Sequence, residues 1–213
     1  MATAFPDVMR VDEQGRPHRF GGRHNACPNS PTYRRFAPAL AGHLARRYAG
    51  RDVVALWHVS NEYGGACYCP RCEGAFRVWL RERYGTLDAL NHAWNAAFWS
   101  QTITAWDEIV APNELSVQGG ERTTAVQGLT LDYQRFMSDA LLGAYRLEAG
   151  AIRAEIPDAV ITTNLMGTYR PLDYREWAPH LDVIAWDSYP SPQDTPAAIA
   201  LRHTLMRSLT VSY

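Results

Sequence analysis

The sequence has no long hydrophobic run and no surplus of positive charge. No stretch of about 18 apolar residues occurs, so we do not expect the chain to span a bilayer. Lysine and arginine together number 21 against 22 aspartates and glutamates, which leaves no basic excess for binding a phosphate backbone. We therefore expect neither a membrane nor a nucleic acid as a partner.

Signals for export and for nucleotide binding are also missing. The first residues, MATAFPDVMRVDEQ, include an acid at position 7 and contain no apolar segment of the kind found in secretory leaders. We therefore expect a cytoplasmic protein. No glycine-rich phosphate loop follows any of the apolar runs, which disfavours a nucleotide-binding doubly wound sheet.

Short apolar runs and helical patterns follow one another along the 213 residues. The runs at 53–59, 159–163 and 183–186 are typical of buried parallel strands. The spacing of apolar residues, together with glycine, threonine and proline at the ends, predicts helices at 36–50, 76–85, 86–94, 131–156, 172–181 and 195–209. Residues 1–35 and 100–129 are predicted to be loops. Trp57, Trp79 and Trp94 fall within these patterns, and we interpret them as core residues.

The alternation of strands and helices is typical of a parallel sheet with crossover helices. A complete (β/α)8 barrel takes roughly 250 residues, and the predicted strands are fewer than its eight. We therefore predict an α/β fold that is a partial (β/α)8 TIM barrel.

The segment WHVSNEYG places Asn61 and Glu62 immediately after the first predicted strand. In α/β barrels the carboxyl ends of the strands hold the active site. A carboxylic acid that leaves an apolar strand is partly withdrawn from water, which favours the protonated form that a general acid needs. The position alone is also compatible with a solvated glutamate in a loop, since most carboxylates at strand ends are structural.

The cysteines give a second signal. Cys67, Cys69 and Cys72 follow a C-x-C-x-x-C pattern, and Cys27 is the remaining one. Four thiolates match a closed tetrahedral zinc site, which would have no open position for water and would therefore be structural. Such a site would join the loop after Glu62 to the loop that carries Cys27. Two disulfides would close strained loops, and redox chemistry at the C-x-x-C pair lacks a thioredoxin-like context.

An Asn-Glu pair at a strand end resembles the acid/base signature of the retaining barrel glycosidases. WHVSNEYG followed by CYCPRC is similar to the β-galactosidases of glycoside hydrolase family 42, and so are GGRHNACPNSPTYRRF at 21–36, TTNLMGTY at 162–169 and LDVIAWDSYP at 181–190. The resemblance extends from about Phe5 to Leu209. It implies a retaining β-galactosidase that hydrolyses terminal, non-reducing β-D-galactosyl residues, with Glu62 as general acid/base and with structural zinc on the four cysteines.

The resemblance also implies sugar-binding roles for Arg23, Asn61 and Tyr189, and a homotrimer for the full-length protein. Arg23 taken by itself is one of many surface arginines. Asp187, close to Tyr189, is compatible both with a role in the site and with capping of the loop that follows it.

A retaining mechanism needs a second carboxylate about 5–5.5 Å from the first. In the family this glutamate follows a strand beyond the last helix predicted here, and none of Glu73, Glu82, Glu108, Glu114 and Glu148 matches its motif. We therefore expect residues 1–213 to be a fragment of the catalytic barrel, without its first strands and its nucleophile, and to be inactive alone. The alternative is a non-catalytic zinc-stapled carbohydrate-binding module or a degenerate fragment.

Overall fold

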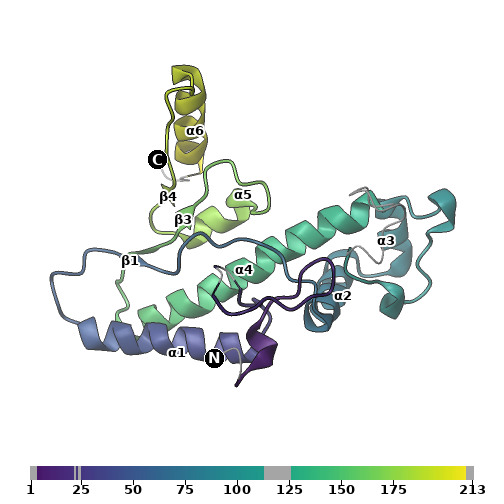
Figure 1. Ribbon diagram of the computed structural model, residues 1–213, viewed down its shortest axis with the longest axis horizontal. Helices are drawn as coiled ribbons and strands as arrows, with labels where there is room; N and C mark the ends of the chain where they lie inside the picture. The colour runs from purple at the N-terminus through teal and green to yellow at the C-terminus, as the bar shows by residue number, and fades with distance from the viewer. Residues whose placement is uncertain (1–3, 22, 24, 113–125, 210–213) are drawn as a thin grey trace. The chain divides into compact units, whose positions relative to one another are not determined.

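The computed structural model describes residues 4–21, 23, 25–112 and 126–209 (Figure 1). The chain divides into two compact units, Met1–Tyr33 with Gly65–Ala140 and Arg34–Gly64 with Leu141–Tyr213. Helices α1 (Pro31–Tyr48) and α4 (Gln127–Glu155) each run from one unit into the other. None of the helices in the described part of the chain combines the length and the apolar character that a membrane crossing requires.

The first unit consists of an irregular amino-terminal segment with the short helix η1 (Pro6–Val8), the helices α2 (Pro70–Tyr84) and α3 (Leu87–Trp94), the turns η2 (Phe98–Ser100) and η3 (Trp106–Glu108), and the beginning of α4. Gly85 ends α2 with φ of 72°, and the Thr86 side chain accepts a hydrogen bond from the amide of Ala89 to begin α3. Both boundaries confirm the sequence prediction, because glycine and threonine act through local backbone geometry.

The second unit contains short parallel strands. β1 (Trp57–His58) pairs with β2 (Ile161–Thr162), and β3 (Asn164–Leu165) pairs with β4 (Ala185–Trp186). Only Thr163 separates β2 from β3, so residues 161–165 lie between β1 on one side and β4 on the other. The helices α5 (Tyr174–Trp177), η5 (Ala178–His180) and α6 (Pro196–Ser208) complete the unit. The parallel order confirms the predicted α/β class.

The prediction for 53–59 was wrong in its length. Only Trp57 and His58 form a strand, whereas Val53 is 86% exposed and Leu56 is 42% exposed. The amide of Val54 donates to the carbonyl of Arg51, which makes a turn in place of the predicted start of the strand. An apolar run becomes a strand only where a partner strand is available, and β2 reaches only as far as Trp57 and His58.

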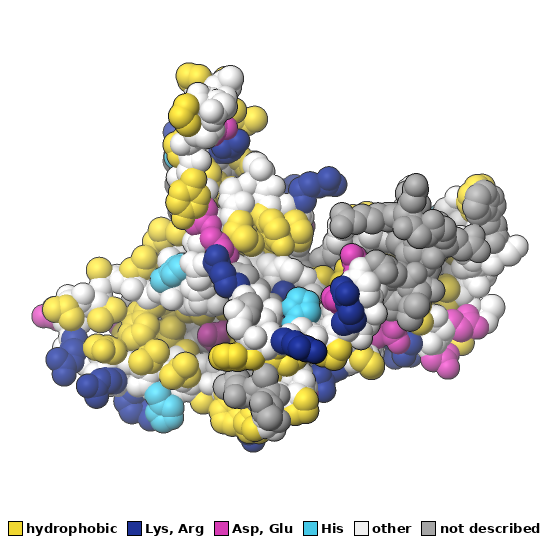
Figure 2. All heavy atoms as spheres, in the orientation of Figure 1, with side chains coloured by type: hydrophobic (Ala, Val, Ile, Leu, Met, Phe, Trp, Pro, Cys, Tyr) yellow, Lys and Arg dark blue, Asp and Glu magenta, His cyan; other side chains and the backbone are white. Residues whose placement is uncertain are grey.

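Helix α1 confirms the predicted spacing of its apolar residues but leaves them uncovered. Leu40, Leu44 and Tyr48 are exposed, and Figure 2 shows hydrophobic side chains gathered over α1 and the segment that leads into β1. The helix packs on α4 at Gly42, where an added Cβ would lie 3.6 Å from the carbonyl oxygen of Ala151. The exposed apolar residues Leu40, Leu44 and Tyr48 therefore lie apart from the contact between α1 and α4 at Gly42.

Several smaller predictions also need correction. The long helix begins at Gln127 rather than at 131, the segment 172–181 divides into α5 and η5, and the loop predicted for 1–35 ends where α1 begins. Trp94 is buried as expected, but Trp57 and Trp79 are only partly buried. The indole N–H of Trp79 donates to Asp139 at 2.7 Å, which holds the ring at the surface. Gly119, Gly120 and Glu114, in the predicted loop, lie outside the described residues.

Candidate active site and metal centre

Glu62 follows β1 on an unusual backbone. Ser60 and Glu62 both have positive φ, 56° and 52°, in the left-handed region that residues other than glycine rarely adopt. Such backbone conformations persist only where surrounding contacts fix them, and they concentrate at functional sites. The Glu62 side chain is partly buried, as the sequence predicts for a strand-end acid, whereas Asn61 is exposed.

Asn164 holds this backbone from the neighbouring strand. Its Oδ1 accepts a hydrogen bond from the amide of Glu62 at 2.8 Å, and its Nδ2 donates to Oδ1 of Asp187 at 2.9 Å. The backbone N–H of Asn164 donates to Nε2 of His58 at 3.1 Å. Because the carboxyl ends of parallel strands meet at one edge, β1, β3 and β4 bring these groups together there. The Glu62 amide, which donates to Oδ1, and the Asp187 carboxylate, which accepts from Nδ2, fix which way the amide group of the Asn164 side chain points.

The two residues that follow Glu62 are fixed as well. Tyr63 is buried, donates its hydroxyl to Glu148 at 3.1 Å, and packs against Tyr145 and Trp177 with ring centroids 6.1 and 5.5 Å away. Gly64 is closely packed, because a Cβ there would lie 3.0 Å from Cε of Met166 and 3.1 Å from the hydroxyl of Tyr169, so that these side chains would have to shift. The contacts of Tyr63 and Gly64 therefore fix the chain directly after Glu62.

The other sugar-binding candidates are exposed. Tyr189 lies after β4, on the segment that begins with Asp187, and is 84% exposed. Arg23 is exposed and belongs to the first unit, whereas Glu62, Asn61 and Tyr189 belong to the second. The structure therefore places Glu62, Asn61 and Tyr189 after the ends of β1 and β4.

Sequence reasoning missed Asn164 and His58 and left Asp187 undecided. The Asp187 carboxylate accepts the hydrogen bond from Asn164, which supports a role at the site over capping of the following loop. The signal that could have found Asn164 is its position at the end of the second apolar run, inside the TTNLMGTY motif.

The cysteines converge as predicted. Cys27, Cys67, Cys69 and Cys72 are buried and free, and their sulfur atoms all lie within 4.8 Å of one another. Sγ of Cys27 is 3.8 Å from Sγ of Cys69 and 3.4 Å from Sγ of Cys72, much farther than the bonded distance of about 2.0 Å in a disulfide. A tetrahedral metal with bonds of about 2.3 Å to sulfur separates its ligands by about 3.8 Å. The cluster therefore has the spacing of a metal site.

Hydrogen-bond donors surround these sulfur atoms. The amide of Val11 donates to Cys67 at 3.5 Å, the amide of Cys72 donates to Cys69 at 3.5 Å, and Nδ2 of Asn29 donates to Cys72 at 3.4 Å. Such donors stabilise thiolates, the form that binds metals.

The thiols also act on one another. Hydrogen bonding with Cys27 lowers the pKa of Cys67 to about 7 and lowers the pKa of Cys69 as well. The corresponding hydrogen bonds raise the pKa of Cys27 and that of Cys72. The cluster thus favours thiolates at Cys67 and Cys69, which gives a buried cation-binding donor set.

The cysteine cluster brings together separate segments of the first unit. Cys69 is the amino-terminal cap of α2, and Cys72 lies in the first turn of that helix. The hydroxyl of Tyr133, from α4, donates to the carbonyl of Cys67 at 2.6 Å. A metal at the cluster would therefore tie the loop of Cys27 to the loop that precedes α2, as the sequence predicts.

The comparisons with known proteins identify one family. The β-galactosidase model of glycoside hydrolase family 42 matches residues 1–212. β-Galactosidase BgaP of a Planococcus species is 56% identical over 98% of this chain and 31% of its own length, and LacZ of Lactobacillus acidophilus is 46% identical over 98% and 32%. The crystal structure of the β-galactosidase from Bacillus circulans sp. alkalophilus superimposes with a TM-score of 0.93 at 56% identity, over 98% of this chain and 31% of that one. The chain thus spans less than a third of the length of these first relatives.

Proposed function

The chain belongs to the β-galactosidases of glycoside hydrolase family 42, and we propose that it carries the acid/base half of a retaining β-galactosidase site, with Glu62 as the general acid/base. The observation that supports this most strongly is the position of Glu62 after β1, on a left-handed backbone held by Asn164. The substrates are terminal, non-reducing β-D-galactosyl residues. The relatives' names support the substrate class, and the strand-end geometry supports the residue.

In the proposed mechanism Glu62 donates a proton to the glycosidic oxygen as the leaving group departs and then removes a proton from the attacking water. The side-chain hydrogen bond of Tyr63 and the close packing at Gly64 support the position of the neighbouring Glu62 between the two steps.

The second carboxylate must attack the opposite face of the anomeric carbon. In a retaining enzyme its carboxyl group lies about 5–5.5 Å from that of the acid/base residue. Glu148, in α4, is engaged by the hydroxyl of Tyr63, and Glu73 and Glu82 belong to α2 in the other unit. We propose that the nucleophile comes from polypeptide other than these 213 residues, so that the chain alone does not hydrolyse galactosides.

Three side chains are proposed to bind the galactosyl group. Asn61 and Tyr189 are exposed beyond the ends of β1 and β4, where their amide and hydroxyl groups are accessible to sugar hydroxyls. Arg23 is proposed for the same role from the family resemblance, and its guanidinium group supplies several donors.

The metal is proposed to be zinc with a structural role. Four cysteine ligands close the coordination sphere, so the bound ion would fix loops and supply no water or substrate position. Gly65, on the segment between Glu62 and Cys67, has φ of 75° and contacts the Arg10 guanidinium. The ligand loop thus follows the acid/base loop directly in the chain.

A chimera tests the catalytic proposal. Residues 1–213 replace the matching third of the Planococcus β-galactosidase, and hydrolysis of a chromogenic β-galactoside is compared with that of the parent and of the isolated chain. We expect an active chimera and an inactive isolated chain. A folded, metal-loaded chimera without activity would contradict the proposal, and so would robust hydrolysis by the isolated chain that persists after Glu62→Ala.

A non-catalytic carbohydrate-binding fragment is the second candidate, and it is favoured by the absence of the nucleophile motif at Glu73, Glu82 and Glu148. It predicts that the isolated chain binds galactose and that the chimera stays inactive. The homotrimer implied by the family is a further proposal for the full-length protein, and light scattering of the chimera would test it.

A further inference from the structure

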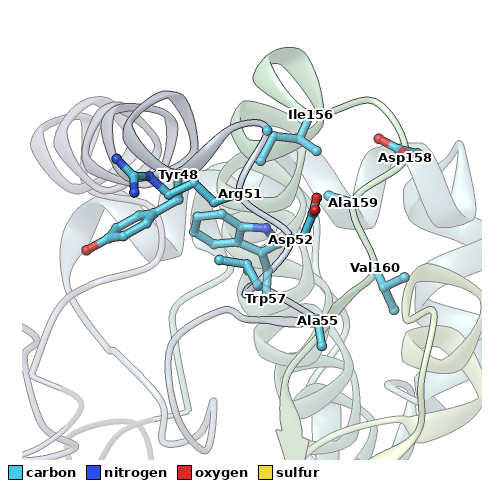
Figure 3. Close-up of a pocket in the computed structure, with 11 residues that line it drawn as sticks. Tyr48, Arg51, Asp52, Ala55, Trp57, Ile156, Asp158, Ala159 and Val160 are labelled. Carbon is cyan, nitrogen blue, oxygen red and sulfur yellow. The ribbon is translucent and has the colours of Figure 1, made fainter.

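A concave site lies at the opposite end of the strands from Glu62. It has a volume of about 360 Å³ and is lined by the end of α1 and the loop after it, by the start of β1, and by the segment between α4 and β2. We refer to this cavity, formed around Trp57 by residues 48–57 and 156–160, as the Trp57 pocket (Figure 3). Its size falls in the range of roughly 300–1,000 Å³ that small-molecule sites occupy.

The aromatic part of the pocket is accessible. Trp57 is only partly buried, and in Figure 3 its indole lies between the Tyr48 ring and the Asp52 carboxylate. Within the part of the chain that the structure describes, the indole N–H of Trp57 has no hydrogen-bond acceptor. Side chains alternate along a strand, and His58 is directed to Asn164 at the candidate active site, so Trp57 lies on the other face of β1.

The electrostatics of the pocket favour a cation. Asp52 and Asp158 both line it, and neither carboxylate forms a hydrogen bond or an ion pair with any residue that the structure describes. Arg51 is the one cationic lining residue, and in Figure 3 its guanidinium extends past Tyr48, away from both carboxylates. The carboxyl ends of α1 and α4, at Tyr48 and Glu155, add partial negative charge at the same place.

From this combination we infer that the Trp57 pocket binds an organic ammonium ion. The faces of indole and phenol rings attract a cation through their negative π surface, and carboxylates beside the rings add Coulomb attraction. An anion would meet two carboxylates and two helix carboxyl ends, and a purely apolar ligand would leave both carboxylates uncompensated. The inference is independent of the role of Glu62, because no residue of the pocket belongs to the candidate active site.

The experiment uses choline as the cation and 3,3-dimethylbutan-1-ol as its neutral isostere, which has carbon in place of the nitrogen. The readout is the indole N–H signal of Trp57 in two-dimensional NMR spectra of the 213-residue chain, identified by its loss in Trp57→Phe. The signal of Trp94, which is buried and bonded to Asp132 at 2.9 Å, serves as the internal reference. We expect choline to shift the Trp57 signal saturably, with an affinity roughly tenfold above that of the isostere.

The double variant Asp52→Asn/Asp158→Asn should weaken choline binding roughly fivefold and leave the isostere unaffected, since each exposed carboxylate contributes modestly. The matched control, Asp88→Asn/Asp107→Asn, removes the same charge from exposed positions in the other unit and should change nothing. Equal binding of choline and the isostere, equal losses in both double variants, or no saturable shift at Trp57 would overturn the inference. Preferential binding of galactose at Trp57 would also overturn it and would identify a saccharide site.

Discussion

The side-chain oxygen of Asn164 accepts a hydrogen bond from the backbone amide of Glu62, over a distance of 2.8 Å and a separation of 102 positions in the sequence. The other end of the same amide group donates to Asp187. The proposed acid/base residue is thus held by a side chain on β3, and that side chain is oriented by Asp187, the residue that follows β4. This arrangement couples the left-handed backbone at Glu62, after β1, to β3 and to the residue that follows β4.

Exchanging the donor and the acceptor between Asn164 and Asp187 tests whether their hydrogen bond supports the backbone at Glu62. In Asn164→Asp the Glu62 amide keeps an acceptor, but the new carboxylate faces that of Asp187, and we expect a loss of about 1–3 kcal/mol in the free energy of unfolding. Asp187→Asn should be milder, because its amide can turn its oxygen toward Asn164. The double variant restores a donor between the two positions and should recover at least half of the loss. Denaturant unfolding measures the free energy of unfolding of each variant, and hydrogen exchange measures the protection of the Glu62 amide. A double variant as unstable as the sum of both singles would show that the pair does not act as described.

Metal analysis tests the cysteine cluster. The chain purified without chelator should contain about one zinc ion, and Cys72→Ala should lose it together with much of the thermal stability of the first unit. Asn29→Ala removes only the donor to the Cys72 sulfur and should lower zinc affinity by roughly 10- to 100-fold while the site persists. Zinc-free protein with paired disulfides would contradict the assignment.

The aromatic contacts of Tyr63 should contribute more to the free energy of unfolding than its hydrogen bond does. Tyr63→Phe removes the bond to Glu148 and should cost about 0.5–1.5 kcal/mol. Tyr63→Ala also opens a cavity beside Tyr145 and Trp177 and should cost about 3–5 kcal/mol. Denaturant unfolding of both variants gives the two values, and equal losses would show that the packing of the ring contributes little.

Asp7 should make stability depend on pH in the acid range. The hydroxyl of Ser30 donates to its carboxylate at 2.6 Å, and this bond, with those from Thr32, lowers the pKa of Asp7 below its usual value of 3.8. A lowered pKa stabilises the fold above the unfolded-state pKa, and the contribution disappears as the pH falls through the folded-state value. Asp7→Asn should therefore lower the melting temperature near neutral pH, and the difference should shrink below about pH 4. A difference that is constant across this range would mean that the ionised form is not the one that stabilises.

How far the sequence could predict this structure depends on the range of the interactions. The end of α2 at Gly85 and the start of α3 at Thr86 follow from local geometry, and both were predicted. The cysteine cluster was also predicted, because a metal site requires its ligands to converge wherever they lie in the sequence. Asn164 was missed, since its bond to Glu62 depends on the register of strands that are joined by α2, α3 and α4. The length of β1 was wrong for the same reason, because its partner and not its own residues determines where pairing ends.

The catalytic role of Glu62 is tested most directly by varying the leaving group in the active chimera. Glu62→Gln removes the proton donor and keeps the shape of the side chain and the contacts of its backbone amide. Galactosides with poor leaving groups need protonation of the glycosidic oxygen, so their turnover should fall by roughly 10²–10⁴. Substrates with very good leaving groups depart without that proton, and their first step should be much less affected.

The matched control is Glu82→Gln, on the exposed surface of α2, which should leave both substrates unchanged. Stability effects are separated from chemistry by the comparison itself, because partial unfolding lowers turnover of both substrates by the same factor. Glu62→Gln should therefore produce a difference between the substrates that no loss of folded enzyme can imitate. Equal losses on the two substrate types would mean that Glu62 is not the acid, and the acid/base role would then have to be sought at another carboxyl group.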